Sequence, residues 1–531
     1  MTAQPGDSER HIVPRWRSLA ATIAAGELSH RGRPRGSGAR LSSKPLQAKV
    51  ELTFQARVTE WQIERDLPAA EELVAAAIAS QRFSDPDAQD AATLLTRDGS
   101  ASPTTRQLAN LFLKSTSDAI HSQRRNLQLR LQLNKRKRLL EIYPRDSLLL
   151  TETALIYLFL ADRTKAAHFL WRASALTPND RYVARSMVRF LVHIGDPEAA
   201  VAFSRRLTAS FHDPWLLSAM LAAGEAAGVP VQGIREARRM LSSKNFSEFD
   251  LGELASAVAS IQLRNGGDRL ARRHFRQSLL DPTENAVAQA EWARRRDGLI
   301  DVTQAQLSVP GAFEAMAWEA YATADWQRSL DATRKWFEAE PFSPIPAIHG
   351  SFLAAEMLHD PATALSLADD GLVFNKHEPT LLNNKAVALA LLGRLDDAEQ
   401  TLSTVGVGND GIAIKATRGL IAMRRGNLTV GAESYLQAIQ MAVDARTPEI
   451  WARASAHFAR EIGRYSPAIA VDIAGHVERA VLSERWKSVR VAPDVAVLLN
   501  QVKAIEAVDG AIDHIEDIRR EFIERSGDVV V

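Results

Sequence analysis

Several features that mark common protein classes are missing from this chain of 531 residues. It has no cysteine, which excludes a disulfide framework, thiolate zinc sites and cysteine nucleophiles, and fits a reducing compartment. Aromatic residues are sparse at 6%, although ten of them are tryptophan, and the formal net charge is only +1. The hydrophobic content of 46% and charged content of 24% are ordinary for a soluble globular protein.

The chain also lacks a hydrophobic run long enough to cross a membrane. Its most apolar stretch, residues 148–160 (LLLTETALIYLFL), is shorter than the roughly 20 residues that a membrane helix needs, and it contains Glu152. Residues 19–25 are weakly apolar, but Arg31, Arg33 and Arg35 follow where a secretory signal has its cleavage site. We therefore expect a cytoplasmic protein that makes no membrane contact.

No motif of catalysis or metal binding stands out. The glycine cluster at residues 406–411 (GVGNDG) lacks the Lys and the preceding strand of a phosphate-binding loop. His457 and Glu461 lie one helical turn apart, but such a pair without a third ligand is more typical of a polar helix surface than of a metal site. We predict a non-catalytic protein without a metal ion or cofactor.

What the chain does have is a repeat of about 34 residues, clearest at residues 147–180, 213–243, 311–344 and 379–405. In each unit a first helix carries a large apolar residue, a small residue four positions on, and an apolar or aromatic residue three beyond. A turn with Gly, Asn or Asp follows, and then a second helix with Ala at the close contacts. Small residues let helix axes approach, and one such pair must stack on its neighbours to bury its apolar face.

This pattern resembles the tetratricopeptide repeat family. Residues 147–180 give nearly the whole pattern, which runs Leu150, Ala154, Tyr157, Asp162, Ala166, Leu170, Ala173 and Pro178. The unit at residues 213–243 departs from it, because Gly233 stands where the second helix should carry Ala. The resemblance implies an all-α solenoid of stacked antiparallel helix pairs, with about nine to ten units. It also implies a scaffold or adaptor that holds a protein partner along its concave face.

Composition and the repeat together divide the chain into four parts. Residues 1–45 form a basic tail, with eight Arg or Lys against three acidic residues, and the Gly, Pro, Ser and Arg of residues 31–45 predict disorder. Residues 46–146 are helical but irregular. Residues 126–133 alternate as a strand would, yet their Leu, Gln and Arg favour a helix over residues 120–140. Residues 147–480 are the repeat array, and residues 481–531 form amphipathic capping helices.

The resemblance places partner binding on the concave face, which the first helix of each unit lines. We expect two arginines there to attract carboxylates and three aromatic side chains to anchor apolar groups of the partner. One asparagine matches the family's carboxylate-clamping pattern. The alternative for Trp318 and Tyr321 is simple packing against a neighbouring helix. The candidate residues are Arg185, Arg189, Trp318, Tyr321, Phe352 and Asn383.

A second candidate surface is basic, because residues 120–140 hold seven cationic residues and no acidic one. These are Arg124, Arg125, Arg130, Lys135, Arg136, Lys137 and Arg138. Together with the basic tail, such a helix can neutralise phosphates without sequence specificity. The alternative function is therefore a nucleic-acid-associated regulator or defence component. An acidic protein partner, or a helix face that is merely solvated, would explain the same charges.

Overall fold

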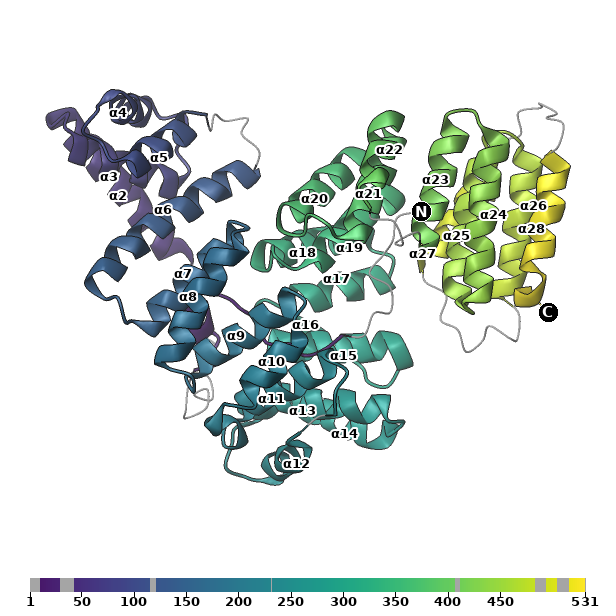
Figure 1. The fold of residues 1–531 in the computed structure, drawn as a ribbon, viewed down its shortest axis with the longest axis horizontal. Helices are drawn as coiled ribbons and strands as arrows, with labels where there is room; N and C mark the ends of the chain where they lie inside the picture. The colour runs from purple at the N-terminus through teal and green to yellow at the C-terminus, as the bar shows by residue number, and fades with distance from the viewer. Residues whose placement is uncertain are drawn as a thin grey trace. The chain divides into compact units, whose positions relative to one another are not determined.

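The computed structural model describes residues 10–28, 43–114, 121–230, 232–405, 411–482, 493–503 and 515–530. All regular structure in these residues is helical, and successive helices pair and stack along the chain (Figure 1). The predicted all-α solenoid is confirmed. The chain divides into two compact units, residues 12–258 and residues 259–531 together with residues 1–11, which we call the N-terminal and the C-terminal unit.

The first helices of the N-terminal unit precede the repeats. They are α1 (Leu19–Ala24), α2 (Ser43–Ile63), α3 (Leu67–Ser80), α4 (Pro86–Arg97), α5 (Pro103–Lys114) and α6 (His121–Ile142). Helices α2 to α6 share a core that includes Phe54, Trp61, Leu73 and Phe112. Helix α6 confirms the helical interpretation of residues 120–140, since the helix preference of Leu, Gln and Arg outweighs the alternation.

The repeats of the N-terminal unit follow as helix pairs. They are α7 (Ser147–Phe159) with α8 (Arg163–Leu176), α9 (Arg181–His193) with α10 (Pro197–Ser204), and α11 (Pro214–Ala226) with α12 (Ile234–Ser242). A single turn, η1 (Thr208–Phe211), precedes α11, and α13 (Glu248–Arg264) spans the unit boundary. In each pair we call the first helix the inner helix.

The C-terminal unit continues the array. Its helices are α14 (Asp268–Ser278), α15 (Glu284–Asp297), α16 (Gln304–Leu307), α17 (Phe313–Ala322), α18 (Trp326–Ala339), α19 (Pro344–Phe352), α20 (Pro361–Phe374), α21 (Pro379–Leu391), α22 (Leu395–Ser403), α23 (Ile412–Arg424), α24 (Leu428–Asp444), α25 (Pro448–Ile462), α26 (Pro467–Val481), α27 (Pro493–Lys503) and α28 (Ile515–Val530). A π-helical turn, η2 (Leu353–Met357), extends α19. Helices α27 and α28 lie in the region that we expected to cap the array, and they bury Leu498 and Phe522 in the core of the last repeats.

The turn between paired helices explains why the repeat can be recognised in the sequence. Ala161 and Ala324 both adopt left-handed backbone conformations, with φ of 60° and 59°, and each is followed by an aspartate that begins the second helix. Asp162 and Asp325 accept hydrogen bonds from backbone N–H groups three residues further on, at 3.0 and 3.2 Å. Such caps satisfy N–H groups that the helix itself leaves without a partner.

The departure at Gly233 also has a structural reason. Gly233 lies before α12 rather than within it, and its φ of 86° is one that glycine adopts readily. A Cβ atom at this position would lie 2.8 Å from side-chain atoms of Leu217 and Met220. The second helix of this unit therefore begins later than the repeat pattern predicts. None of the helices in the described ranges combines the length and apolar character needed to cross a membrane.

Candidate peptide-binding site

Residues 12–28, which we call the N-terminal segment, are ordered against the N-terminal unit. The predicted disorder of residues 1–45 is wrong for this part, and residues 29–42 lie outside the described residues. From residue 12 to residue 18 the backbone is extended, and Ile12, Pro14 and Trp16 are buried while Val13 and Arg15 are only partly covered. A two-residue alternation is what an extended peptide shows when one side of it is held by a surface. The disorder prediction failed because its signal came from residues 31–45, which are poorer in apolar residues.

The N-terminal segment contacts the inner helices α7 and α9, and Arg185 of α9 in turn contacts Trp215 of α11 and Glu253 of α13. We call the contacting side chains of these four helices the inner groove. Several of these bonds are made to the backbone of the segment. The Leu19 N–H donates to Glu152 Oε1 at 2.7 Å, and the guanidinium of Arg181 donates to the Glu27 carbonyl at 2.7 Å. The Tyr182 hydroxyl lies 3.0 Å from the Arg17 carbonyl and 2.9 Å from Glu152. Burial and the Glu152 carboxylate raise the pKa of Tyr182, so the hydroxyl keeps its proton.

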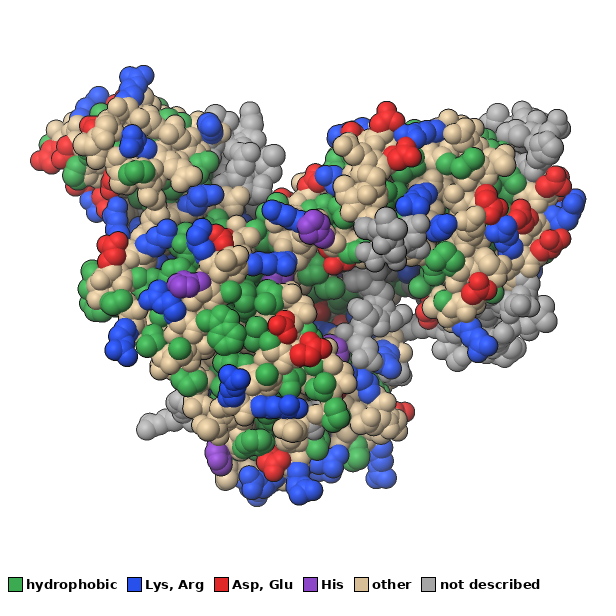
Figure 2. Space-filling view, viewed as in Figure 1, with side chains coloured by type: hydrophobic (Ala, Val, Ile, Leu, Met, Phe, Trp, Pro, Cys, Tyr) green, Lys and Arg blue, Asp and Glu red, His purple; other side chains and the backbone are tan. Residues whose placement is uncertain are grey.

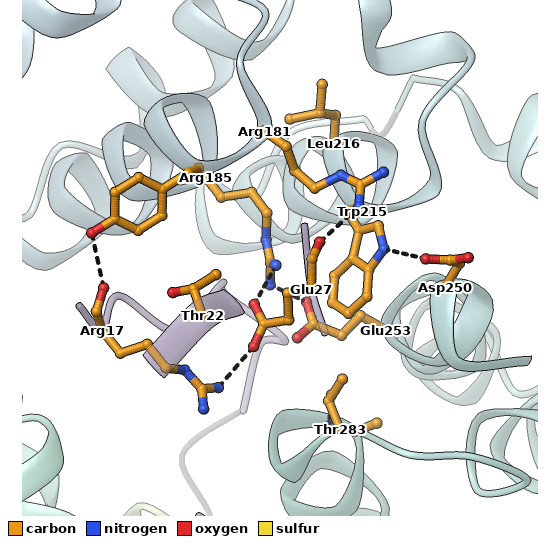
Figure 3. A network of polar contacts seen from close by, with 12 residues as sticks. Arg17, Thr22, Glu27, Arg181, Arg185, Trp215, Leu216, Asp250, Glu253 and Thr283 are labelled. Carbon is orange, nitrogen blue, oxygen red and sulfur yellow. Dashed lines mark hydrogen bonds and ion pairs between the residues drawn. The ribbon is translucent and has the colours of Figure 1, made fainter. Parts of the chain in front are cut away.

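A buried network of ion pairs lies at the Glu27 end of the N-terminal segment (Figure 3). Arg185 of α9 points between two carboxylates and donates to Glu27 Oε2 at 2.7 Å and to Glu253 Oε2 at 2.8 Å. Arg17 of the segment lies 3.0 Å from the other oxygen of Glu27. The Arg185 guanidinium also lies 4.6 Å from the centre of the Trp215 ring. Burial opposes the charge, yet the carboxylates of Glu253 and Glu27 raise the pKa of Arg185 above its ordinary value.

Charged groups of the inner groove also have partners within the array itself. Arg185 keeps Glu253 as a partner, Arg181 lies 2.8 Å from Asp213, and Arg136 lies 2.7 Å from Glu152. The segment contributes its own pair, because Arg17 and Glu27 contact each other. The charges of the inner groove and those of the N-terminal segment are therefore largely neutralised within each of the two. This pairing keeps isolated charge out of the buried surface.

Of the two arginines expected on the concave face, only one is partly exposed. Arg185 is buried, with 4% of its surface accessible, because the chain's own Glu27 already supplies a carboxylate. Arg189, one turn further along α9, keeps intermediate exposure. The carboxylates that Arg185 contacts in the structure belong to this chain, and its contact with a partner stays a prediction.

The aromatic candidates belong to the C-terminal unit, and they are buried there. The Trp318 ring lies 4.2 Å from the His349 ring and 4.0 Å from the Arg295 guanidinium. The Tyr321 hydroxyl donates to Asp494 of α27 at 2.7 Å, and Phe352 is fully buried nearby. We predicted that these rings anchor a partner, but burial removes them from any open surface, and packing between helices describes them better. Asn383 is also buried, and its side-chain oxygen accepts a hydrogen bond from Thr417 at 2.8 Å.

Arg10, just before the N-terminal segment, is bound by side chains of the C-terminal unit. The Arg10 guanidinium donates to both carboxylate oxygens of Glu314, at 2.8 and 2.9 Å. It also donates to Gln289 at 2.5 Å and to Asn285 at 2.8 Å, both on α15. A bidentate arginine–carboxylate pair with further acceptors is a specific contact rather than a chance one. Arg10, which we expected in a disordered tail, is therefore held by a carboxylate and two amide side chains.

His457 and Glu461 are not the polar surface pair that the sequence predicts. Both are buried within the C-terminal unit. Glu461 pairs with Arg424 at 3.2 Å, and the neighbouring Arg460 lies 2.7 Å from Glu356 in the π-helical turn η2. Burial alone would raise the pKa of Glu356, but Arg460 lowers it, so the carboxylate remains charged. These two ion pairs link α23, α25 and η2, and we assign them a structural role. Across the described residues, no His, Asp and Glu side chains form a group of three suited to a metal ion.

The basic helix α6 is partly used for internal contacts. Arg136 pairs with Glu152, Arg138 lies 3.5 Å from Glu71, and the Arg125 guanidinium lies 5.5 Å from the centre of the Phe159 ring. Arg130, Lys135, Lys137 and Arg138 remain exposed, whereas the side chain of Arg124 lies outside the described residues. Figure 2 shows Lys and Arg side chains spread over the displayed face of both units, interspersed with Asp and Glu. The same view shows hydrophobic side chains on the surface formed by α8 to α11.

Several groove residues were not predicted from the sequence, and of these Glu152, Tyr182 and Glu253 make the central contacts. A signal for two of them was present, because Glu152 and Glu253 are the only carboxylates in two apolar stretches (LLLTETALIYLFL and LGELASAVAS). A lone acid in such a run must be paired when it is buried. Nothing in the local sequence indicates that Glu253 pairs with Arg185, 68 residues away, or that Glu152 accepts from Leu19, 133 residues away.

No family model matches the chain, and no curated protein matches its sequence. Three solved structures are similar over much of its length. A chain from the crystal structure of the APC/C hetero-tetramer Cut9–Hcn1 has 11% identity and a TM-score of 0.39, covering 90% of this chain and 94% of that one. Yeast Tom70 has 14% identity and a TM-score of 0.30 (71% and 93% covered). A chain of Naa15/Naa10 bound to HypK-THB has 13% identity and a TM-score of 0.23 (90% and 93% covered).

Proposed function

We propose that this protein is a non-catalytic scaffold or adaptor that binds an extended segment of a protein partner in the inner groove. The observation that carries the proposal is the N-terminal segment itself. It contacts the inner helices α7 and α9, it buries alternate side chains from Ile12 to Trp16, and groove side chains bond to its backbone. Backbone-directed bonds with alternating side-chain contacts are the mode by which extended peptides are recognised.

Site-specific photo-crosslinking in the native host tests this function. A photoreactive amino acid replaces Arg189, which lies on the inner helix α9 with intermediate exposure. The matched control replaces Trp171, which is about half exposed on α8, the second helix of its pair. We expect a protein crosslinked from position 189 and insensitive to nuclease, with no such product from position 171. Identical products from both positions, or none from position 189, would contradict the proposal.

The alternative function, nucleic-acid association, is favoured by the exposed cations of α6. Arg130, Lys135 and Lys137 lie on one helix with their side chains accessible. Such a surface would bind phosphates with an affinity that falls steeply as salt rises. The basic residues of the N-terminal segment support it less, because Arg17 contacts a carboxylate of this chain.

Binding of labelled duplex RNA and DNA across a salt series tests this alternative. The double variant Lys135→Glu/Lys137→Glu should abolish binding if α6 is the contact surface. Its control is Arg334→Glu/Lys335→Glu, which reverses two exposed charges on α18. Equal affinity for the two variants, or no binding at low salt, would eliminate this function.

A further inference from the structure

The inner groove is filled in this structure by part of the same chain, and the contact has the properties of an exchangeable one. We propose that the N-terminal segment is an internal ligand that competes with the partner for the inner groove. The partner is then a protein segment of the same chemistry. It has an extended stretch with apolar side chains at alternate positions that ends on a large aromatic ring, then a short helix like α1, and a carboxylate about eleven residues beyond the ring. This inference rests on the proposed adaptor function and names the chemistry of its partner.

The side chains of the N-terminal segment define what the groove accepts. Ile12 and Trp16 each have 1% of their surface exposed, and the Trp16 ring meets Phe190 of α9 edge to face, with the ring centres 6.2 Å apart. Buried aromatic residues of this kind supply most of the binding energy of a peptide contact. Trp16 therefore marks the place for an aromatic anchor.

Glu27 defines the second requirement. Its carboxylate lies 2.7 Å from Arg185, in a position that excludes water. A competing segment must bring a carboxylate to the same place to make an equivalent ion pair, since the array offers a fixed cation there. Between these two points the groove bonds to backbone atoms of Arg17, Leu19 and Glu27, which leaves the intervening sequence of a competitor free to vary.

The electrostatics of the groove permit exchange. When the segment leaves, Arg185 retains Glu253 at 2.8 Å and Arg181 retains Asp213 at 2.8 Å. The departing Arg17 and Glu27 already contact each other. Removing one partner from a buried ion pair is unfavourable chiefly because it leaves an uncompensated charge. Here the array and the departing segment each keep an ion pair of their own, so less uncompensated charge remains on either.

Attachment to the same chain gives the segment an advantage over a free competitor. Intramolecular tethering corresponds to an effective concentration on the order of millimolar. A partner segment must overcome this concentration, or the internal segment must be weakened, before binding is observed. Weakening the segment without touching the groove should therefore increase the affinity for an added peptide.

The test uses the full-length protein and a fluorescein-labelled synthetic peptide of residues 12–28 as the probe. The double variant Ile12→Ala/Trp16→Ala changes the segment alone, and Ile23→Ala, whose side chain is exposed on α1, is the matched control. We expect the double variant to bind the probe at least tenfold more tightly than wild type or Ile23→Ala. A probe with Trp16→Ala should lose at least tenfold in affinity, and one with Glu27→Gln should lose severalfold. Equal probe affinity for wild type and the double variant would overturn the proposal.

A second measurement needs no substitution and so cannot be confused by misfolding. Excess unlabelled peptide is added to the wild-type protein, and amide hydrogen exchange is followed in residues 12–28. Competition requires these amides to exchange faster while those of α9 stay protected, and unchanged exchange at saturating peptide would again overturn the proposal. The probe comes from this chain, so these results do not depend on an external partner. A partner crosslinked at position 189 that is unaffected by Ile12→Ala/Trp16→Ala would refute only the competition and leave the adaptor function standing.

Discussion

The inner helices of the two units are covered by different kinds of structure. In the N-terminal unit the cover is the N-terminal segment, an extended stretch followed by the short helix α1, and charged groups of the groove beneath it are paired within the array. In the C-terminal unit the cover is the amphipathic helix α27, whose buried Asp494 accepts from Tyr321 at 2.7 Å and from Arg453 at 2.7 Å. Leu498 and Val502 of the same helix belong to a continuous core. The first cover is suited to exchange, and the second is part of the folded core.

Replacing Asp494 should have the largest effect. The variant Asp494→Ala leaves Arg453 without this carboxylate in a buried site, and the loss should lower the free energy of unfolding by about 3–5 kcal/mol. Chemical denaturation followed by circular dichroism measures the change. The control is Asp331→Ala, about half exposed and 3.8 Å from Arg334, which should lose less than about 1 kcal/mol. Similar losses for the two variants would show that α27 is not integral to the core.

Acid should weaken the C-terminal unit through His349. Burial, and then the nearby Arg295, lower the pKa of this imidazole from 6.5 to about 3. Below pH 6.5 the unfolded chain therefore binds a proton at His349, whereas the folded protein binds it only near pH 3. The contribution of the neutral imidazole to the free energy of unfolding is therefore complete above pH 6.5 and is lost as the pH falls. Between pH 6.5 and 4.5 the loss should reach about 2–3 kcal/mol.

The variant His349→Gln should flatten this part of the stability profile, measured by denaturation at a series of pH values. The exposed His212 of the N-terminal unit supplies the control His212→Gln, which should keep the wild-type slope. A slope that is unchanged in His349→Gln would mean that the buried imidazole does not govern the acid response.

Loss of Glu27 should be mild for global stability, in contrast to loss of Asp494. In Glu27→Gln, Arg185 retains Glu253, so we expect a decrease of only about 1 kcal/mol in the free energy of unfolding. Trypsin should cleave after Arg15 and Arg17 more rapidly than in wild type, because the segment is held less firmly. The comparison between the two units fails if Glu27→Gln and Asp494→Ala destabilise the protein equally.

The smallest effect concerns the turns, which the two units share. Ala161 and Ala324 have left-handed backbones, so Ala161→Gly and Ala324→Gly should each stabilise the protein by roughly 0.5–1 kcal/mol. Thermal denaturation reports the gain. Ala154→Gly, in the buried interior of α7, is the control and should destabilise by about 1 kcal/mol or more. A gain in one unit alone would show that the turns are not equivalent.

The helical repeat could be predicted from the sequence because its determinants are local. Spacing of small and large residues placed the pairs α7–α8, α17–α18 and α21–α22 close to their observed bounds. The aspartates that begin second helices act within three residues, as Asp162 does with the Lys165 N–H. The candidate site was predicted less well. Arg185 was named as a residue that attracts a partner's carboxylate, but its burial and its pairing with Glu27 of the same chain were not predicted.

What the sequence determined by itself is therefore the array, meaning which residues form the paired helices and where each pair turns. Only the tertiary structure decided what covers that inner side. Arg185 meets Glu27 across 158 residues of chain, and Tyr321 meets Asp494 across 173. A helical period reports contacts over a few residues, whereas burial of an inner-face side chain depends on which distant segment folds onto it. The same local pattern is compatible with an open groove, an exchangeable cover or a permanent one.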